Sequence, residues 1–365
     1  MANVTYLLGA GASANCLPTY INFFDRFERF KNLFQDTNPH FKDLNEIQKR
    51  DAQNILEVSN RILEESQFHN TPDTIAKKYF HNNSDSSLLT DLKEALIIFF
   101  LHQQILKQKH DENSKETPES RQSIDKRYDA FIASLLEPKR GNLKLYNNFK
   151  ILTWNYDLQF EIAYSRYRKQ NIPYCQTLIQ SYPTIVSDGV NKFDIDKFGI
   201  VHLNGIAYGR GNIATGSLDL VGDFFSDGSY VLKYLTDVYH SIRTVGIPGE
   251  IGGSKLLSFA WEKQNDDGSI TDNDIIKKAI DIAKQTEILV IIGYSFPIFN
   301  TPIDKMLLKE MAQIKKVYIQ SPSGQDIRNS LLYEIFNVSS LKNEDIKDLG
   351  YWNQFRIPSE WNMTY

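Results

Sequence analysis

The sequence has little of several features that mark particular classes of protein. Only two cysteines, Cys16 and Cys175, occur in 365 residues, so a four-cysteine zinc site cannot be built from this chain alone. The longest strongly apolar run, 95–101, is about a third of the length that crosses a bilayer. We therefore expect no metal and no membrane contact, and the scarcity of cysteine fits a reducing compartment.

Positive charge is not in excess either. The net charge is -4, which gives no general attraction to phosphate backbones, so we expect no direct binding of nucleic acid. The first residues enter an apolar β-type run without the basic segment and cleavage site of a secretory signal. A cytoplasmic location is the expectation that follows.

What the sequence does contain is an alternation of buried strands and helices. Short apolar runs typical of strands occur at 4–8, 149–153, 199–203, 287–292 and 317–319. Helical patterns follow or separate them. This order predicts an α/β fold with a Rossmann-like, mostly parallel sheet, helices on both faces and a large helical insertion.

The same patterns suggest how the chain divides. We predict a discontinuous Rossmann domain of 1–20 and 146–335, a helical insertion or cap of 21–145, and a C-terminal extension of 336–365. Apolar residues spaced three and four apart between 88 and 99 support helix in the insertion. The polar stretch 107–127 predicts an exposed connection or a solvated helix end.

Small residues follow the first strand, where Gly9, Ala10, Gly11, Ala12 and Ser13 form a glycine-rich turn. Such a turn lets backbone amides approach a phosphate at the start of the next helix. A plain turn between strand and helix is an equally good interpretation, because a full dinucleotide fingerprint would have a third glycine where Ala14 stands.

Polar residues also follow the second and third predicted strands. Thr153 ends the run 149–153, and Asn155 and Asp157 come just after it. His202 lies near the end of 199–203, and Asn204 follows that run. An amide can hold a ribose hydroxyl or a water, and a histidine can take a proton near neutral pH. Helix capping by Asn155 or Asp157 and a structural role for the histidine are the alternatives.

A second glycine-and-hydroxyl loop follows the strongest strand. It contains Gly293, Tyr294 and Ser295, with Asn300 shortly after, and Ser321 follows the next strand. Two such loops could hold the two ends of one dinucleotide, with Ser321 near an adenosine. A polar turn explains Ser321 equally well.

Taken in order, these motifs resemble the sirtuin-like superfamily, in particular its bacterial anti-phage defence branch. The resemblance implies that NAD is bound as a substrate, with residues 9–13 at the pyrophosphate, Ser295 near the phosphate or ribose, and Asn155 at the nicotinamide ribose or a water. The family usually has its catalytic histidine where this chain has Asn204. We expect His202, two residues earlier on the same face of the strand, to reach the same cleft.

The resemblance implies an NAD glycohydrolase, with Asn155, His202 and Asp157 as candidate catalytic residues. It also implies that the hydrolase activity is restrained until a trigger arrives. The chain is expected to form a homo-oligomer or to bind a co-encoded defence partner protein. The alternative is a catalytically weak NAD or ADP-ribose-binding pseudoenzyme that regulates a partner, which the asparagine at 204 favours. An NAD-dependent protein deacylase is the third hypothesis, although the zinc module that frames its peptide groove is lacking.

Overall fold

The computed structural model describes residues 1–82, 86–104, 124–139, 141, 143–184, 193–208, 228–244, 257–265, 267–271, 273–334, 341–351 and 353–362. Within these, a parallel sheet of seven strands runs in the order β3-β4-β2-β1-β5-β6-β7. The strands are β1 (Val4–Leu8), β2 (Phe149–Thr153), β3 (Ser181–Tyr182), β4 (Gly199–His202), β5 (Ile288–Ile292), β6 (Lys316–Gln320) and β7 (Ile346–Asp348). The predicted α/β fold is confirmed.

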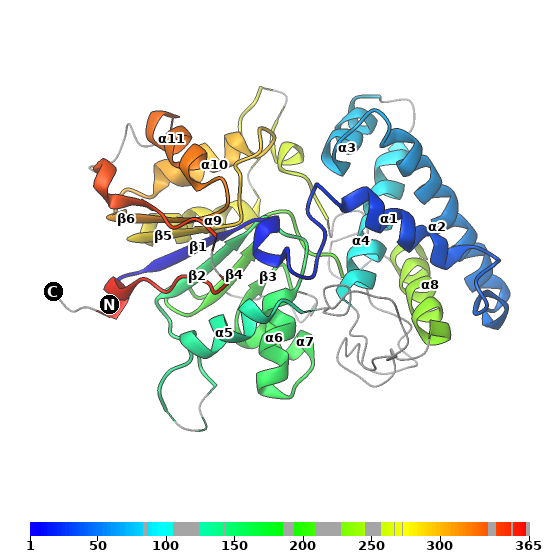
Figure 1. Ribbon diagram of the computed structural model, residues 1–365, viewed down its shortest axis with the longest axis horizontal. Coiled ribbons are helices and arrows are strands. Elements are labelled where there is room, and N and C mark those ends of the chain that lie inside the picture. The colour runs from blue at the N-terminus through cyan, green and yellow to red at the C-terminus, as the bar shows by residue number, and fades with distance from the viewer. Residues whose placement is uncertain are drawn as a thin grey trace.

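Two layers of helices cover the sheet, as Figure 1 shows. Alternate side chains of each strand enter opposite layers: Tyr6 lies in one core, and Leu7 in the other. One face carries α5 (Lys126–Leu135), α6 (Gln159–Arg168) and α7 (Ile172–Leu178), and the other carries α9 (Asp274–Gln285), α10 (Thr301–Glu310) and α11 (Gly324–Glu334). Helices on both faces explain why the central strands are almost wholly apolar.

A separate group of helices lies beside the carboxyl edge of the sheet (Figure 1). It consists of α1 (Phe23–Lys31), α2 (Glu46–Glu65), α3 (Pro72–His81), α4 (Ser86–Gln104) and α8 (Gly228–Thr244). The end of α4 meets the loop after β2, where the side chain of Gln104 accepts a 2.7 Å hydrogen bond from the Leu158 amide. No helix in the described part of the chain is long and apolar enough to span a membrane.

The helical group and the sheet divide the chain differently from the sequence segments. Helix α5, which belongs to the predicted insertion, packs on the sheet, with the ring of Phe131 4.7 Å from that of Tyr6. Helix α8 comes from a later segment yet packs against α2 and α4. Strand β7 and the buried Phe355 lie in the predicted C-terminal extension but complete the sheet and its core.

Candidate functional site

The residues singled out from the sequence lie together at the carboxyl edge of the sheet. Gly9 follows β1, Asn155 follows β2, Asn204 follows β4, Gly293 follows β5 and Ser321 follows β6. Strand order runs outward from β1 on one side and from β5 on the other, so the topology reverses between these two strands. Open α/β sheets bind their ligands at such a reversal.

The two glycine loops at this reversal are packed backbone against backbone. The Gly9 amide donates to the Ile292 carbonyl at 3.0 Å, and the Gly11 amide donates to the Gly293 carbonyl at 2.9 Å. A Cβ on Gly9 or Gly11 would lie 2.7 Å from the backbone of Gly293. Glycine is needed here for the close approach of the two loops, whatever else the loops bind.

The glycine-rich turn after β1 leads into a short 3₁₀-helix and not directly into an α-helix. Ala10–Ser13 form a 3₁₀-helix of four residues, and α1 begins only at Phe23. The Ala12 amide is also used internally, since it donates to the Gly9 carbonyl at 2.8 Å. Ala10, which is exposed, has no described partner for its amide. The loop therefore offers a ligand few amides.

Ser13 and Asp157 face each other behind this loop. The Ser13 hydroxyl donates to Oδ2 of Asp157 at 3.0 Å and lies 3.1 Å from the hydroxyl of Tyr128. Oδ1 of Asp157 accepts the amide of Gln159, the first residue of α6, at 3.0 Å, although the N-cap residue of this helix is Leu158. Burial raises the pKa of Asp157 to about 6. Its carboxyl group thus ties the glycine loop to α6.

The two asparagines have unfilled acceptors. Nδ2 of Asn155 donates to the Gly9 carbonyl at 2.9 Å, while no described residue donates to its Oδ1. Nδ2 of Asn204 lies 3.4 Å from the Trp154 carbonyl, and its Oδ1 is fully buried without a partner among the described residues. Oδ1 of Asn204 is a buried carbonyl oxygen without a described donor, which costs free energy, so its place beside Asn155 is a candidate ligand position.

Both ring nitrogens of His202 have partners within the protein. Its Nε2 lies 2.8 Å from Oε1 of Glu161, and its Nδ1 lies 3.4 Å from the Asn155 carbonyl. The side chain is 2% exposed. Strand β4 ends at His202, and the chain turns through Gly205 at a φ of +78°. Positions 202 and 204 therefore do not share a strand face, and the expectation that His202 reaches the cleft is wrong for this conformation.

The histidine and Glu161 form a buried ion pair. Burial favours the neutral forms of both groups, but their mutual attraction outweighs it, lowering the pKa of Glu161 and raising that of His202. Ser181 donates a further hydrogen bond to Glu161 at 2.6 Å. Since both ring nitrogens have partners inside the protein, His202 has no lone pair left for a substrate proton.

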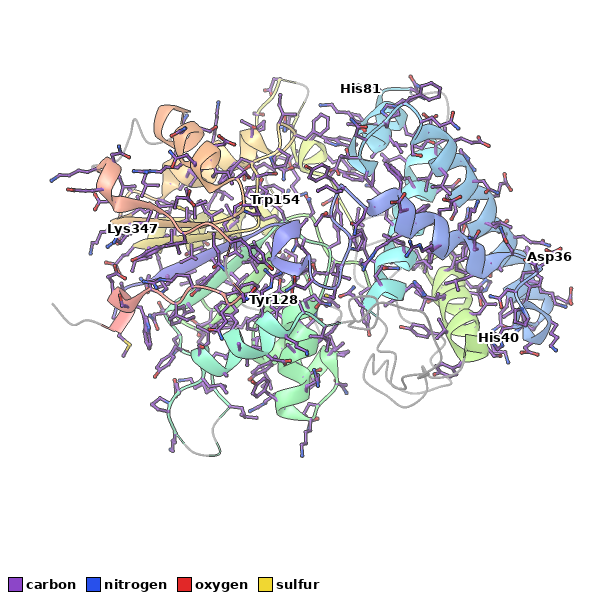
Figure 2. The ribbon with its side chains drawn as sticks, viewed as in Figure 1. Asp36, His40, His81, Tyr128, Trp154 and Lys347 are labelled. Atoms are coloured by element: carbon purple, nitrogen blue, oxygen red, sulfur yellow. The ribbon has the colours of Figure 1, made fainter. Side chains whose placement is uncertain are left out.

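A buried network follows β5. The Tyr294 hydroxyl donates to Asp304 at 2.6 Å, Nε1 of Trp154 donates to the same carboxyl at 3.1 Å, and Asn300 donates to the Tyr294 hydroxyl at 3.0 Å. Trp154 and Tyr128, both labelled in Figure 2, lie on opposite sides of the sheet edge. Burial raises the pKa of Asp304 to about 7. This network fixes the second loop.

The hydroxyls of the later loops differ in access. Ser295 is exposed at the turn after Tyr294, where it is open to a ligand. Phe296, next to it, has a φ of +54°, which is uncommon for an aromatic residue and strains the turn. Ser321 is buried and lies 3.3 Å from the hydroxyl of Ser323, as in a plain polar turn. Thr153 accepts the Asn155 amide at 3.1 Å and so shapes the first loop.

Sequence reasoning missed two charged residues at the glycine loop. Arg127 donates through Nη2 to the Gly11 carbonyl at 3.1 Å and the Ala12 carbonyl at 3.0 Å, and Nε donates to Asp125. Both are buried, so the predicted exposed connection 107–127 is wrong at its end; residues 105–123 lie outside the described part. The one available signal was the opposite charges at 125 and 127 just before an apolar helical pattern.

Comparisons of the chain with protein-family models, with curated proteins and with solved structures give no match. The resemblance drawn from the motifs therefore stays a prediction.

Proposed function

We propose that the chain binds NAD at the reversal between β1 and β5 and cleaves the bond between nicotinamide and ribose. The observation that carries this proposal is the buried amide oxygen of Asn204, which has no donor among the described residues and lies near Asn155 and the two interlocked glycine loops. Amide oxygens accept hydrogen bonds from hydroxyls and carboxamides, which NAD supplies on its ribose and nicotinamide. The exposed Ser295 would lie near the phosphates.

The chemistry proposed for the site differs from base catalysis by histidine. Loss of nicotinamide leaves positive charge on the ribose, as in other glycosyl transfers. Such a cation needs a positioned water more than a strong base. Oδ1 of Asn155 can hold that water or the ribose. Asp157, whose pKa of about 6 leaves it mostly ionised at neutral pH, would stabilise the positive charge on the ribose by its negative charge.

A binding protein without turnover is the second candidate, and a specific observation favours it. His202 is held by Glu161 and the Asn155 carbonyl, and Asn204 stands where the resemblance expects a histidine. An amide cannot act as an ordinary base. On this reading the site senses NAD or ADP-ribose and passes its state to a partner protein.

One experiment separates the candidates. Purified chain is titrated with NAD and with ADP-ribose by calorimetry, and nicotinamide release is followed by chromatography, with and without candidate partners. We expect saturable binding and released nicotinamide, both reduced in Asn155→Ala and Asn204→Ala and unchanged in a matched surface amide variant, Asn60→Ala. Binding without release under every condition would leave the sensor, and no binding of either ligand would overturn both.

The oligomeric state and the deacylase hypothesis need separate experiments. The homo-oligomer and the co-encoded partner rest on the resemblance alone, and light scattering of the purified chain tests the first. Release of O-acetyl-ADP-ribose from an acetylated peptide would favour the deacylase over the hydrolase.

A further inference from the structure

A serine and a lysine lie in contact next to Asn204. The backbone pairs at Gly205 and Leu257, and the Ser258 amide donates to the Asn204 carbonyl at 2.9 Å. The short 3₁₀-helix η8 (Ala260–Lys263) then turns the chain back, which brings Nζ of Lys263 to 2.8 Å from Oγ of Ser258. Ser258 is partly exposed as a residue, while Lys263 is 4% exposed.

Among the residues that the structure describes, no carboxylate forms an ion pair with the amine of Lys263. Glu262, the neighbouring carboxylate, is taken by Lys93 of α4 at 2.6 Å and by the Phe259 amide at 2.7 Å. The remaining described partner of Nζ is the Phe259 carbonyl, at 3.3 Å. Burial lowers the pKa of Lys263 to about 7, with Glu262 opposing this and Lys93 adding to it. A large share of the amine is therefore neutral near neutral pH.

We propose that Ser258 and Lys263 form a nucleophile and base pair that cleaves carboxylic esters, a reaction separate from dinucleotide chemistry. The Ser258 hydroxyl attacks the carbonyl carbon and its proton passes to Nζ of Lys263. The bond from carbon to the alcohol oxygen then breaks, the alcohol leaves with that proton, and Ser258 is acylated. Water releases the acid in a second step, and Lys263 again carries the proton. Serine and lysine pairs support acyl transfer on several unrelated folds.

A structural role for the lysine makes different predictions. If Nζ merely satisfies the Phe259 carbonyl and the Ser258 hydroxyl, the charged amine donates to both, and the serine is no more reactive than a surface serine. If Lys263 activates Ser258, the rate at which Ser258 reacts is proportional to the fraction of Lys263 that is neutral. Its reactivity must rise with pH through the pKa of Lys263.

The test uses the intact chain with a fluorophosphonate probe, which forms a bond to an activated serine oxygen and loses fluoride. Mass spectrometry locates the adduct and gives its rate. We expect labelling at Ser258 to rise between about pH 6 and about pH 8. Ser258→Ala should abolish it, and Lys263→Met should slow it by about 10²-fold or more. Ser269→Ala, a nearby exposed serine whose hydroxyl donates to Asp267, is the matched control and should change nothing.

The same experiment defines what overturns the proposal. Labelling of Ser258 no faster than of Ser269, or a Ser258 rate that does not change over this pH range, excludes the pair. If Lys263→Met does not fold, the pH dependence of the native chain still decides. Turnover of p-nitrophenyl acetate by the native chain, lost in Ser258→Ala, then tests the full ester cleavage.

Discussion

Replacing Gly293 by alanine tests the interlocked glycine loops most directly. The backbone at Gly293 has a φ of +58°, so alanine is strained there by about 1–2 kcal/mol. Its Cβ would also lie under 3.0 Å from the backbone of Gly11 and Ala12, which cannot rotate away. Overpacking of this kind adds about 1–3 kcal/mol. We expect Gly293→Ala to lower the free energy of unfolding by about 2–5 kcal/mol.

Gly268→Ala is the control that isolates the clash. Gly268 has a φ of +79°, and a Cβ built there meets nothing within 4 Å. It therefore carries the backbone strain without the collision and should lose about 1–2 kcal/mol. Urea unfolding followed by circular dichroism measures both variants. Equal losses in the two would refute the claim that the loops are pressed together.

Three further predictions concern buried polar groups. Glu161→Gln should destabilise the chain by about 3–5 kcal/mol because it removes the partner of a buried, charged histidine. In the native chain the stability given by the pair is lost as pH rises through the raised pKa of His202 and as pH falls through the lowered pKa of Glu161. A urea series should show neither of these two losses of stability in the variant. Burial holds the pKa of Asp304 at about 7, whereas the unfolded chain releases that proton at a lower pH, so the native chain should lose stability as pH rises from about 4 to about 7. Asp304→Asn should not show this loss. Parallel curves of stability against pH for the native and variant chains would contradict the prediction. Asn204→Ala should cost no more than about 1 kcal/mol, because the removal of a buried oxygen that has no described donor offsets the loss of the long hydrogen bond to the Trp154 carbonyl. A larger loss in the urea series would mean that the oxygen is satisfied.

The sheet could be predicted from the sequence because its central strands are buried on both faces. The bounds of β1 and β2 match the apolar runs at 4–8 and 149–153, and the predicted run 287–292 starts one residue before β5. Strands β3 and β7 were missed, since they have two and three residues and lie at the sheet edges. An edge strand of that length carries no apolar run to detect.

The place of α8 could not be predicted, although its existence could. The sequence of 230–242 predicts a helix, and α8 spans Gly228–Thr244. Its partners lie almost two hundred residues earlier, where Gln48 donates to Asp237 at 2.9 Å and Nδ1 of His240 lies 2.9 Å from Asp51. Periodicity reports which face of a helix is buried and not which surface buries it.

The site divides in the same way between what topology determines and what packing determines. Parallel strands bring their carboxyl ends to one edge, so the convergence of residues 9, 155, 204 and 293 followed from the strand order alone. Which of these groups is free for a ligand depends on partners from other elements. Glu161 of α6 takes His202, whereas the described residues leave Oδ1 of Asn204 without a donor. Because a ligand can bind only through lone pairs and protons that the fold has not already used, the two asparagines are better candidates for contact with it than the histidine that the sequence favoured.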